Sequence, residues 1–211
     1  MKTKRKPTPS VRRRRNREAM IQEIIETARE IMREEGVAAL TMHELARRLE
    51  IRPPSLYNYY NSKMEIYDEL FRLGFQLFSH AMQDAADAAK TPFDDMRRSM
   101  EAYMNFALQN PELFKLCFER HVPGFVPSQE SMKVVNGVME STLSRINLWV
   151  ERGGFDPQIS MDKAFDLVNA MMHGLVSMHL ANDPQAPMGE GRFGRLIPDA
   201  VRVFEQAWKT A

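Results

Sequence analysis

The sequence predicts an all-α protein, and three features of the chain support this prediction. Apolar residues recur at the 3.6-residue spacing of a helix, most clearly between residues 21 and 32. Capping residues stand directly before prolines at Thr91-Pro92, Asn110-Pro111 and Asp156-Pro157, as they do at the starts of helices. No segment shows the strict apolar-polar alternation of a strand. We expect about nine helices, the first three in a small N-terminal unit and the rest in a larger bundle.

Charge is distributed unevenly along the 211 residues. The first 63 residues carry a formal charge of +7, and the remaining 148 carry −6. A basic end on an acidic body indicates a polyanionic partner at that end. The single cysteine excludes an internal disulfide framework. No signal peptide or membrane span is recognisable, so a cytoplasmic protein without membrane contact is expected.

The chain begins with a strongly basic segment. Residues 1–15 combine eight Lys or Arg residues with two prolines and almost no apolar side chains. This composition predicts a disordered arm. The first helix should follow the arm and end at Gly36, which suits the position after a helix C-terminus.

The segment Thr41 to Tyr60 has the pattern of two short helices joined by a tight turn. Thr41 to Glu44 forms a capping box that starts the first of them. Pro53 and Pro54 can occupy the first turn of the second helix, which should be about two turns long. Its inward-facing residues are Leu56 and Tyr60, and its outward-facing residues are Ser55, Tyr57, Asn58 and Tyr59.

These features predict a helix-turn-helix domain over residues 16–63. A helix that presents Ser, Asn and Tyr outward suits the major groove of double-stranded DNA. Ser62 to Glu65 forms another capping box, which starts the next helix. Lys63 would stand in the first turn of that helix, where a cation and free amide hydrogens suit a phosphate.

The same segment resembles a known family. The stretches ALTMHELARRL, SLYNYY and NSKMEIYDEL match, in order and spacing, the DNA-binding domain of the tetracycline-repressor (TetR/AcrR) family. The resemblance covers residues 17–70, about a quarter of the chain. It implies phosphate contacts from Thr41, Tyr57, Tyr59 and Lys63. It also implies base or groove contacts in the stretch Arg52, Pro53, Pro54, Ser55, Leu56, Tyr57 and Asn58.

Two residues depart from the family pattern. Glu50 stands where the family usually has Gly, and a left-handed backbone there would cost about 1 kcal/mol. Arg52 stands where Ser or Thr usually caps the second helix. The cap is therefore lost, but a guanidinium able to read bases is gained. Sequence readout is expected to depend on Arg52, Ser55 and Asn58.

Arginines in the basic arm are further candidates for DNA contact. Arg12, Arg13, Arg14 and Arg15 stand immediately before the first helix. Arginines in such a position can enter a minor groove or line phosphates. The alternative is that the run only keeps the terminus soluble.

Residues 64–211 are predicted to form a ligand-binding and dimerisation domain. Eleven of the sixteen methionines lie beyond residue 80, and Met adapts to varied apolar partners. An apolar ligand pocket is therefore expected, and the alternative for any one of these side chains is a place in an ordinary core. The candidate ligand-binding residues are Met100, Tyr103, Met104, Phe114, Cys117, Phe118, Met172 and His173.

One stretch of this domain resembles a subgroup of the family named for a Trp-His-Gly motif. The similarity lies in residues 110–128, and the motif aligns with Met172-His173-Gly174, where Met replaces Trp. His173 is either a polar group of the pocket or a hydrogen-bonded core residue. Gly174 inside a helix indicates close helix approach. Cys117 and His121 form only half a metal site, so neither a metal nor a cofactor is expected.

The last two predicted helices, at about 157–182 and 190–210, carry broad apolar faces. In the family such a pair meets its two-fold mate as a four-helix bundle, which implies a homodimer. The candidate dimerisation residues are Phe165, Val168, Met172, Leu175, Val201, Phe204 and Trp208. Pro198 either kinks or starts the last helix.

The expected function is ligand-responsive control of transcription. In this interpretation a homodimer represses from a palindromic DNA operator and is released by a small, largely apolar effector. One alternative is a TetR-like helical protein that acts through protein partners without specific DNA binding. An enzyme is not expected, because the sequence has no Gly-rich phosphate loop, nucleophile elbow or metal-ligand constellation.

Overall fold

The computed structural model describes residues 9–152 and 160–209 of the chain. Every regular element in those ranges is helical, which confirms the all-α prediction. The N-terminal elements are α1 (Pro9–Glu35), the 3-10 helix η1 (Val37–Ala39), α2 (Met42–Arg48) and α3 (Pro53–Leu56). The others are α4 (Lys63–Asp87), α5 (Pro92–Gln109), α6 (Pro111–Phe118), α7 (Gln129–Glu151), α8 (Met161–Asn182), α9 (Gly191–Gly194) and α10 (Ile197–Trp208).

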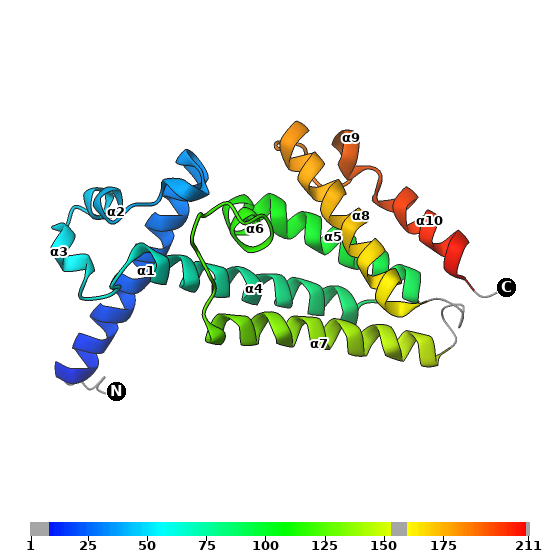
Figure 1. Ribbon diagram of the computed structural model, residues 1–211, viewed down its shortest axis with the longest axis horizontal. Helices are drawn as coiled ribbons and strands as arrows, with labels where there is room; N and C mark the ends of the chain where they lie inside the picture. The colour runs from blue at the N-terminus through cyan, green and yellow to red at the C-terminus, as the bar shows by residue number, and fades with distance from the viewer. Residues whose placement is uncertain (1–8, 153–159, 210–211) are drawn as a thin grey trace, which may run out of the picture.

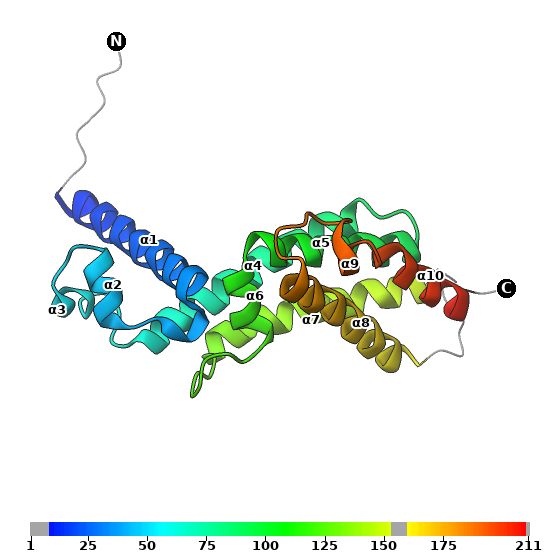
Figure 2. The same cartoon turned by 90° about the horizontal axis from the view of Figure 1, so that it is seen from above.

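The molecule is elongated, with α1 to α3 at one end and α10 at the other (Figure 1). Helix α4 runs from the N-terminal unit into the bundle and crosses the domain boundary predicted at residue 63. Helix α7 lies along α4. Helices α8 and α10 pack on α5, on the side that faces away from α4. The view from above shows α6 between the two ends (Figure 2).

The N-terminal unit closes around one apolar face of α1. Ile24, Ala28 and Ile31 of that face are fully buried, and Leu45 and Leu56 meet them from α2 and α3. Thr41 caps α2 by accepting a hydrogen bond from the backbone of Glu44, as the capping box predicted. The buried side chains therefore fix how α2 and α3 lie on α1.

Helix α1 is longer than the sequence indicated. It begins at Pro9, so residues 9–15, which were predicted to be disordered, are helical instead. Arginine is a good helix former, and Arg14 pairs with Glu18 one turn later across 3.4 Å. These local interactions favour the helix, in which Arg13, Arg14 and Arg15 are exposed. The rest of the predicted arm, residues 1–8, lies outside the described residues.

The turn between α2 and α3 follows the sequence interpretation in part. Glu50 has φ 53°, the left-handed conformation that Gly would adopt at lower cost. Arg52 precedes α3 without making a side-chain cap, as expected. Helix α3 has only four residues and continues as a turn through Tyr59, so the predicted two-turn helix is too long. Without a cap, little holds a longer helix here.

The helix starts predicted at Ser62, Thr91 and Asn110 are confirmed, but only one of them has a side-chain cap. Thr91 caps α5, but Ser62 makes no capping hydrogen bond, because Glu65 instead accepts from the backbone and side chain of Asn61. Asn110 makes no capping bond either, since its oxygen accepts from Arg29. The Asp156-Pro157 cap lies outside the described residues.

The C-terminal segment is divided differently from the prediction. The helix expected at 190–210 is two helices, α9 and α10, with a break at Arg195 and Leu196. Pro198 stands in the first turn of α10, so it starts the last helix and does not kink it. None of the described helices is both long and apolar enough to span a membrane.

Candidate DNA-binding surface and ligand cavity

The outward-facing polar residues lie within residues 52–60, which hold α3 and the turn after it and which we call the recognition segment. Arg52, Tyr57 and Asn58 are exposed, and Ser55 is half-buried. Leu56 and Tyr60 are buried behind them, as the sequence predicted, and the Tyr60 hydroxyl donates to Glu69 at 2.7 Å. The buried pair orients this segment so that its polar side chains face away from the protein. Pro54 is exposed on the same segment.

Two candidate phosphate-binding residues flank this segment. Thr41 is exposed at the start of α2, although its hydroxyl oxygen already accepts a hydrogen bond from Glu44. Lys63 is the first residue of α4, and its Nζ lies 3.4 Å from the carbonyl oxygen of Leu40. That weak contact holds the ammonium beside the start of α2. Both candidates therefore lie close together in space.

Arg17 is a residue of this surface that the sequence did not single out. Its Nη1 donates to the carbonyl oxygen of Asn58 at 2.9 Å, and its guanidinium lies 5.1 Å from the centre of the Tyr59 ring. Arg17 therefore ties α1 to the end of the recognition segment. Arg13, Arg14 and Arg15 are exposed in the preceding turn of α1, and the side chain of Arg12 lies outside the described part. Only the aromatic-rich sequence near Tyr59 could have pointed to this contact.

The larger unit contains a cavity of about 400 Å³. Its wall is mostly apolar and comes from the long helices α4, α5, α7 and α8, with α6 adding Phe118 and α10 adding Trp208. Helix α4 contributes Phe75, Phe78 and Met82 to the wall. A largely apolar cavity of this size with a few polar groups is typical of a small-molecule site.

The predicted ligand residues divide into two groups. Tyr103, Phe118, Met172 and His173 line the cavity. Met100, Met104 and Phe114 are instead buried in the core outside its wall. Cys117 also lies outside the wall and packs against Gly74, and its burial raises the pKa of the thiol. His173 lines the cavity and also makes a hydrogen bond, to Tyr103, so the two alternatives considered for it do not exclude each other.

Helix α7 supplies cavity residues that the sequence analysis missed. They recur at helical spacing along one side: Val135, Val138, Met139, Thr142, Arg145, Ile146 and Trp149. That spacing was visible in the sequence, but it could not show which other helix the face would meet.

The predicted dimerisation residues face the protomer's own interior. Phe165, Val168, Met172 and Trp208 line the cavity, and Leu175, Val201 and Phe204 are buried in the core. The prediction is corrected here: these faces of α8 and α10 pack against α5. The other side of α8 also carries apolar residues, and Leu167, Met171 and Met178 are exposed there.

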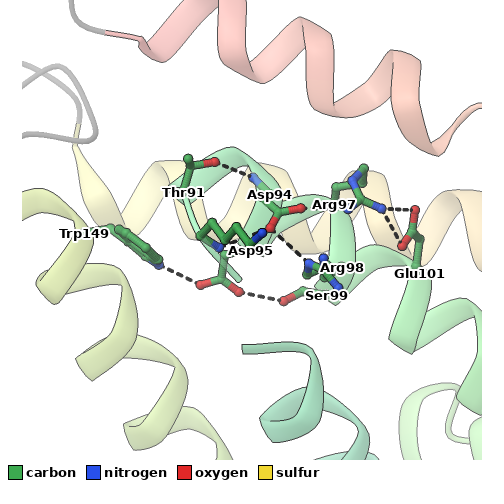
Figure 3. Close-up of polar contacts among 9 residues, drawn as sticks. Thr91, Asp94, Asp95, Arg97, Arg98, Ser99, Glu101 and Trp149 are labelled. Atoms are coloured by element: carbon green, nitrogen blue, oxygen red, sulfur yellow. Dashed lines mark hydrogen bonds and ion pairs between the residues drawn. The ribbon is translucent and has the colours of Figure 1, made fainter. Parts of the chain in front are cut away.

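One polar cluster at the cavity wall surrounds the buried carboxylate of Asp95. Trp149 Nε1 donates to Asp95 at 2.7 Å, and Arg145 Nε lies 2.9 Å from the same oxygen. Ser99 donates to the other oxygen at 3.3 Å. Figure 3 shows Asp95 between Trp149 and Ser99, facing away from the half-buried ion pairs of Asp94 and Glu101. The cluster attaches the C-terminal end of α7 to α5.

A second polar group, which we call the Tyr103–Glu119 chain, connects four side chains. Tyr103 Oη lies 3.0 Å from Nδ1 of His173, whose Nε2 lies 3.4 Å from the hydroxyl of Ser177. Ser177 donates to Oε1 of Glu119 at 3.0 Å. Tyr103 and His173 line the cavity, whereas Glu119 stands at the end of α6.

A buried carboxylate joins the N-terminal unit to the larger helical unit. Glu112 of α6 has no exposed side-chain surface, and Arg29 and Arg33 of α1 reach it at 2.9 and 3.0 Å. Hydrogen bonding to Glu112 raises the pKa of Arg33. Phe114 of the same helix stacks on His173 with ring centres 5.5 Å apart. Helix α6 therefore contacts both α1 and a cavity residue.

Among the described residues, no group of three or more His, Cys, Asp or Glu side chains is arranged to hold a metal ion. The half site noted in the sequence is not assembled, because His121 is exposed and pairs with Glu119 at 2.7 Å. Cys117 instead lies against Phe71 of α4.

Comparison with solved structures identifies this fold in bacterial regulators. A protein of unknown function from Rhodococcus sp. RHA1 has a TM-score of 0.75 and 18% identity, covering 90% of this chain and 95% of that one. The TetR family regulator PfmR of Thermus thermophilus has a TM-score of 0.66 and 22% identity, covering 87% and 97%. FadR of Bacillus subtilis, solved with stearoyl-CoA, has a TM-score of 0.66 and 14% identity, covering 86% and 96%.

Sequence comparison agrees with the fold. The chain is 33% identical over 92 residues to the uncharacterized HTH-type transcriptional regulator YobS of Bacillus subtilis (strain 168). That match spans 44% of this chain and about half, 48%, of the relative. Residues 24–70 match the family described as bacterial regulatory proteins, tetR family. Residues 96–207, more than half of the chain, match the tetracyclin repressor-like C-terminal domain. The chain therefore belongs to the tetR family of bacterial regulatory proteins, which are DNA-binding transcriptional regulators.

Proposed function

We propose that this protein is a repressor whose operator binding is released by a small, largely apolar molecule. The observation that carries the proposal is the continuity of α4. This helix begins at Lys63, next to the recognition segment, and its later turns supply Phe75, Phe78 and Met82 to the cavity wall. A ligand that repacks the cavity wall would therefore act on an element that also carries a DNA contact.

The DNA-binding part of the proposal rests on charge and exposure. Arg52 and Asn58 are exposed on the recognition segment and are proposed to read bases in the major groove. Thr41, Tyr57, Tyr59 and Lys63 are proposed to contact phosphates. The run Arg13, Arg14 and Arg15 would extend the phosphate contacts along α1, beyond the segment tied down by Arg17.

The release mechanism is proposed to pass through α6 as well as α4. Phe118 of α6 lines the cavity, and Phe114, one turn earlier on the same helix, stacks on His173. Glu112 lies in the first turn of α6 and binds Arg29 and Arg33. Any shift of α6 on ligand binding would pull on α1 through this buried ion pair. The ligand would thereby change the spacing of the two recognition segments in a dimer.

A homodimer is proposed to form through the outer side of α8. Leu167, Met171 and Met178 are exposed there at spacings of one and two turns, and such an apolar stripe is typical of a protein contact. Gly174 lies in the same stripe, and a Cβ on it would meet nothing within 4 Å in the protomer. A Gly inside a helix costs about 1 kcal/mol relative to Ala, so close approach of a second helix accounts for it.

The decisive experiment selects DNA from a random pool with the purified protein and then measures binding at three salt concentrations. A palindromic consensus whose affinity falls with salt supports the proposal. Arg52→Ala should then weaken operator binding at particular base pairs, by about 1–3 kcal/mol, and leave scrambled DNA nearly unaffected. Lys63→Ala is the matched control, because loss of a phosphate contact should weaken both duplexes alike and flatten the salt dependence.

The alternative of a regulator that acts only through protein partners makes a different prediction. No consensus would emerge from the pool, and any residual binding would be the same for every duplex. If Arg52→Ala and Lys63→Ala reduce binding equally on operator and scrambled DNA, the recognition segment has been misassigned.

A further inference from the structure

The hydrogen bonds of the Tyr103–Glu119 chain all point the same way, and the carboxylate of Glu119 sets that direction. A carboxylate accepts hydrogen bonds and donates none, so Ser177 must direct its single hydrogen toward Glu119 across 3.0 Å. The Ser177 oxygen can then only accept from His173. Nε2 of His173 must carry the hydrogen in their 3.4 Å contact.

The same logic fixes the groups that line the cavity. A neutral imidazole with hydrogen on Nε2 has a lone pair on Nδ1. Tyr103 must therefore donate its hydrogen to Nδ1, from which its oxygen lies 3.0 Å. Burial raises the pKa of Tyr103, so the hydroxyl keeps its proton and remains this donor. With its only hydrogen committed, the Tyr103 oxygen offers the cavity lone pairs alone.

A second cavity residue has one of its donor hydrogens committed. Asn169 lines the cavity and donates one of its two amide hydrogens to the carbonyl oxygen of Phe165 at 3.0 Å. In the Asp95 cluster, the donors of Trp149 and Ser99 are directed at the Asp95 carboxylate, and Arg145 directs its guanidinium at Asp95 and at the Ser99 oxygen. An apolar molecule with an acceptor alone would face the Tyr103 oxygen with no hydrogen between them. Burying two unpaired acceptors is unfavourable.

We propose that the cavity selects an apolar molecule bearing a hydroxyl or similar hydrogen-bond donor, bound to the oxygen of Tyr103, over the same skeleton bearing only an acceptor. This inference rests on the proposed ligand-sensing function and specifies its ligand class. Ser177 and Glu119, which do not line the cavity, set this preference through His173. They act as positioning residues.

The test compares 2-undecanol with 2-undecanone, which share one skeleton and differ in donor capacity. Binding to the full-length protein is measured by isothermal titration calorimetry. The alcohol should bind about tenfold more tightly, the effect of one buried hydrogen bond against an unpaired acceptor. In Glu119→Gln the amide can donate to Ser177, which allows the whole chain to reverse and lets Tyr103 donate to the ketone. The preference should then fall to about one.

Two further variants separate the chain from general effects on folding. Ser177→Ala releases the His173 tautomer and should also abolish the preference. Ser79→Ala changes a half-buried serine of α4 that lies off the chain, and it should retain the tenfold preference. In ¹⁵N spectra of histidine-labelled protein, the wild-type His173 should carry its hydrogen on Nε2.

Each contrary result has a separate meaning. Equal or tighter binding of the ketone by the wild type overturns the donor preference and leaves the apolar sensor standing. A preference that persists in both Glu119→Gln and Ser177→Ala overturns the role of the chain. If the folded wild type binds neither compound, both this inference and the sensor part of the proposed function fail.

Discussion

At the scale of single residues, Glu112 is a buried carboxylate that depends on its ion pairs with Arg29 and Arg33. Its side chain has no exposed surface, while Arg33 on the opposite side of the contact is 44% exposed. Removing one partner from a buried ion pair leaves an uncompensated charge, which is far more costly than losing a surface pair. The contact between α1 and α6 therefore depends on this one carboxylate.

Glu112→Gln should lower the free energy of unfolding by about 2–3 kcal/mol, somewhat below the usual cost of breaking a buried pair because Arg33 is partly solvated. Chemical denaturation followed by circular dichroism measures this loss. Glu130→Gln is the matched control, since Glu130 pairs with Lys133 on the exposed surface and its loss should leave the free energy of unfolding nearly unchanged. Equal effects of the two changes would mean that the buried pair contributes nothing special.

How well single residues could be predicted depended on how local their interactions are. The Thr41 cap follows from neighbours within a few positions and was predicted correctly. The left-handed Glu50 was considered only because the family usually has Gly at that position. The bond from Arg29 to Glu112 joins residues 83 positions apart, and no local pattern contains it. Arg17 escaped attention for the same reason, because its partner Asn58 is 41 residues away.

At the scale of helices, α4 and α6 cross unusually closely at Gly74. A Cβ built on Gly74 would lie 2.5 Å from the sulfur of Cys117 and 3.5 Å from Cβ of Leu113. The first distance is a clash and the second is ordinary contact. Cys117 is therefore the side chain that makes Gly necessary in α4.

Gly74→Ala should destabilise the protein by about 1 kcal/mol, because an overpacking cost of about 1–3 kcal/mol is partly offset by the better helix propensity of Ala. The double variant Gly74→Ala with Cys117→Ala removes the clashing sulfur and should recover most of the loss. A double-mutant cycle from denaturation curves should give a coupling energy of at least about 1 kcal/mol. Additive effects would contradict the close crossing.

The error in assigning the face of α8 has a physical origin. This helix carries apolar residues on both sides, with Val168 and Met172 toward the cavity and Leu167 and Met171 toward solvent. Periodicity shows that a face is apolar but not whether it meets its own protomer or a second copy. Only the tertiary structure separates the two.

At the scale of the whole molecule, the proposed dimer predicts different effects for substitutions on the two sides of α8. Met171→Glu places a charge on the exposed stripe and should convert a dimer of twice 24.4 kDa into a monomer that keeps its helical content. Sedimentation equilibrium with circular dichroism measures both. Val168→Glu places the charge in the cavity wall and should lower the melting temperature without dissociating the dimer. A monomeric wild type at micromolar concentration would exclude the α8 interface.

The cavity shows what composition alone could reach. Abundant Met and Phe predicted an apolar pocket in the C-terminal domain, and half of the eight named residues line the observed cavity. The contributions of α4 and α7 were not predicted, because they depend on helices brought together from residues 75 to 149. Phe75 and Trp149 share no sequence signal that would place them in one wall.

Helix α7 is fastened at its two ends and loosely packed between them. At its start, Asp68 accepts hydrogen bonds from the backbone and hydroxyl of Ser128 at 2.7 and 2.8 Å, and at its end Asp95 holds Arg145 and Trp149. Of its described residues only Ser131, in the first turn, is fully buried.

A helix that is anchored only at its ends can bend outward in the middle while both ends stay bound. We therefore expect that the cavity can widen to admit ligands of different widths. The rate at which ligands enter and leave would then depend on bending of α7, and not on unfolding of the whole bundle. Amides in the middle of α7 should exchange with deuterium faster than those of α4, and a bound ligand should slow them.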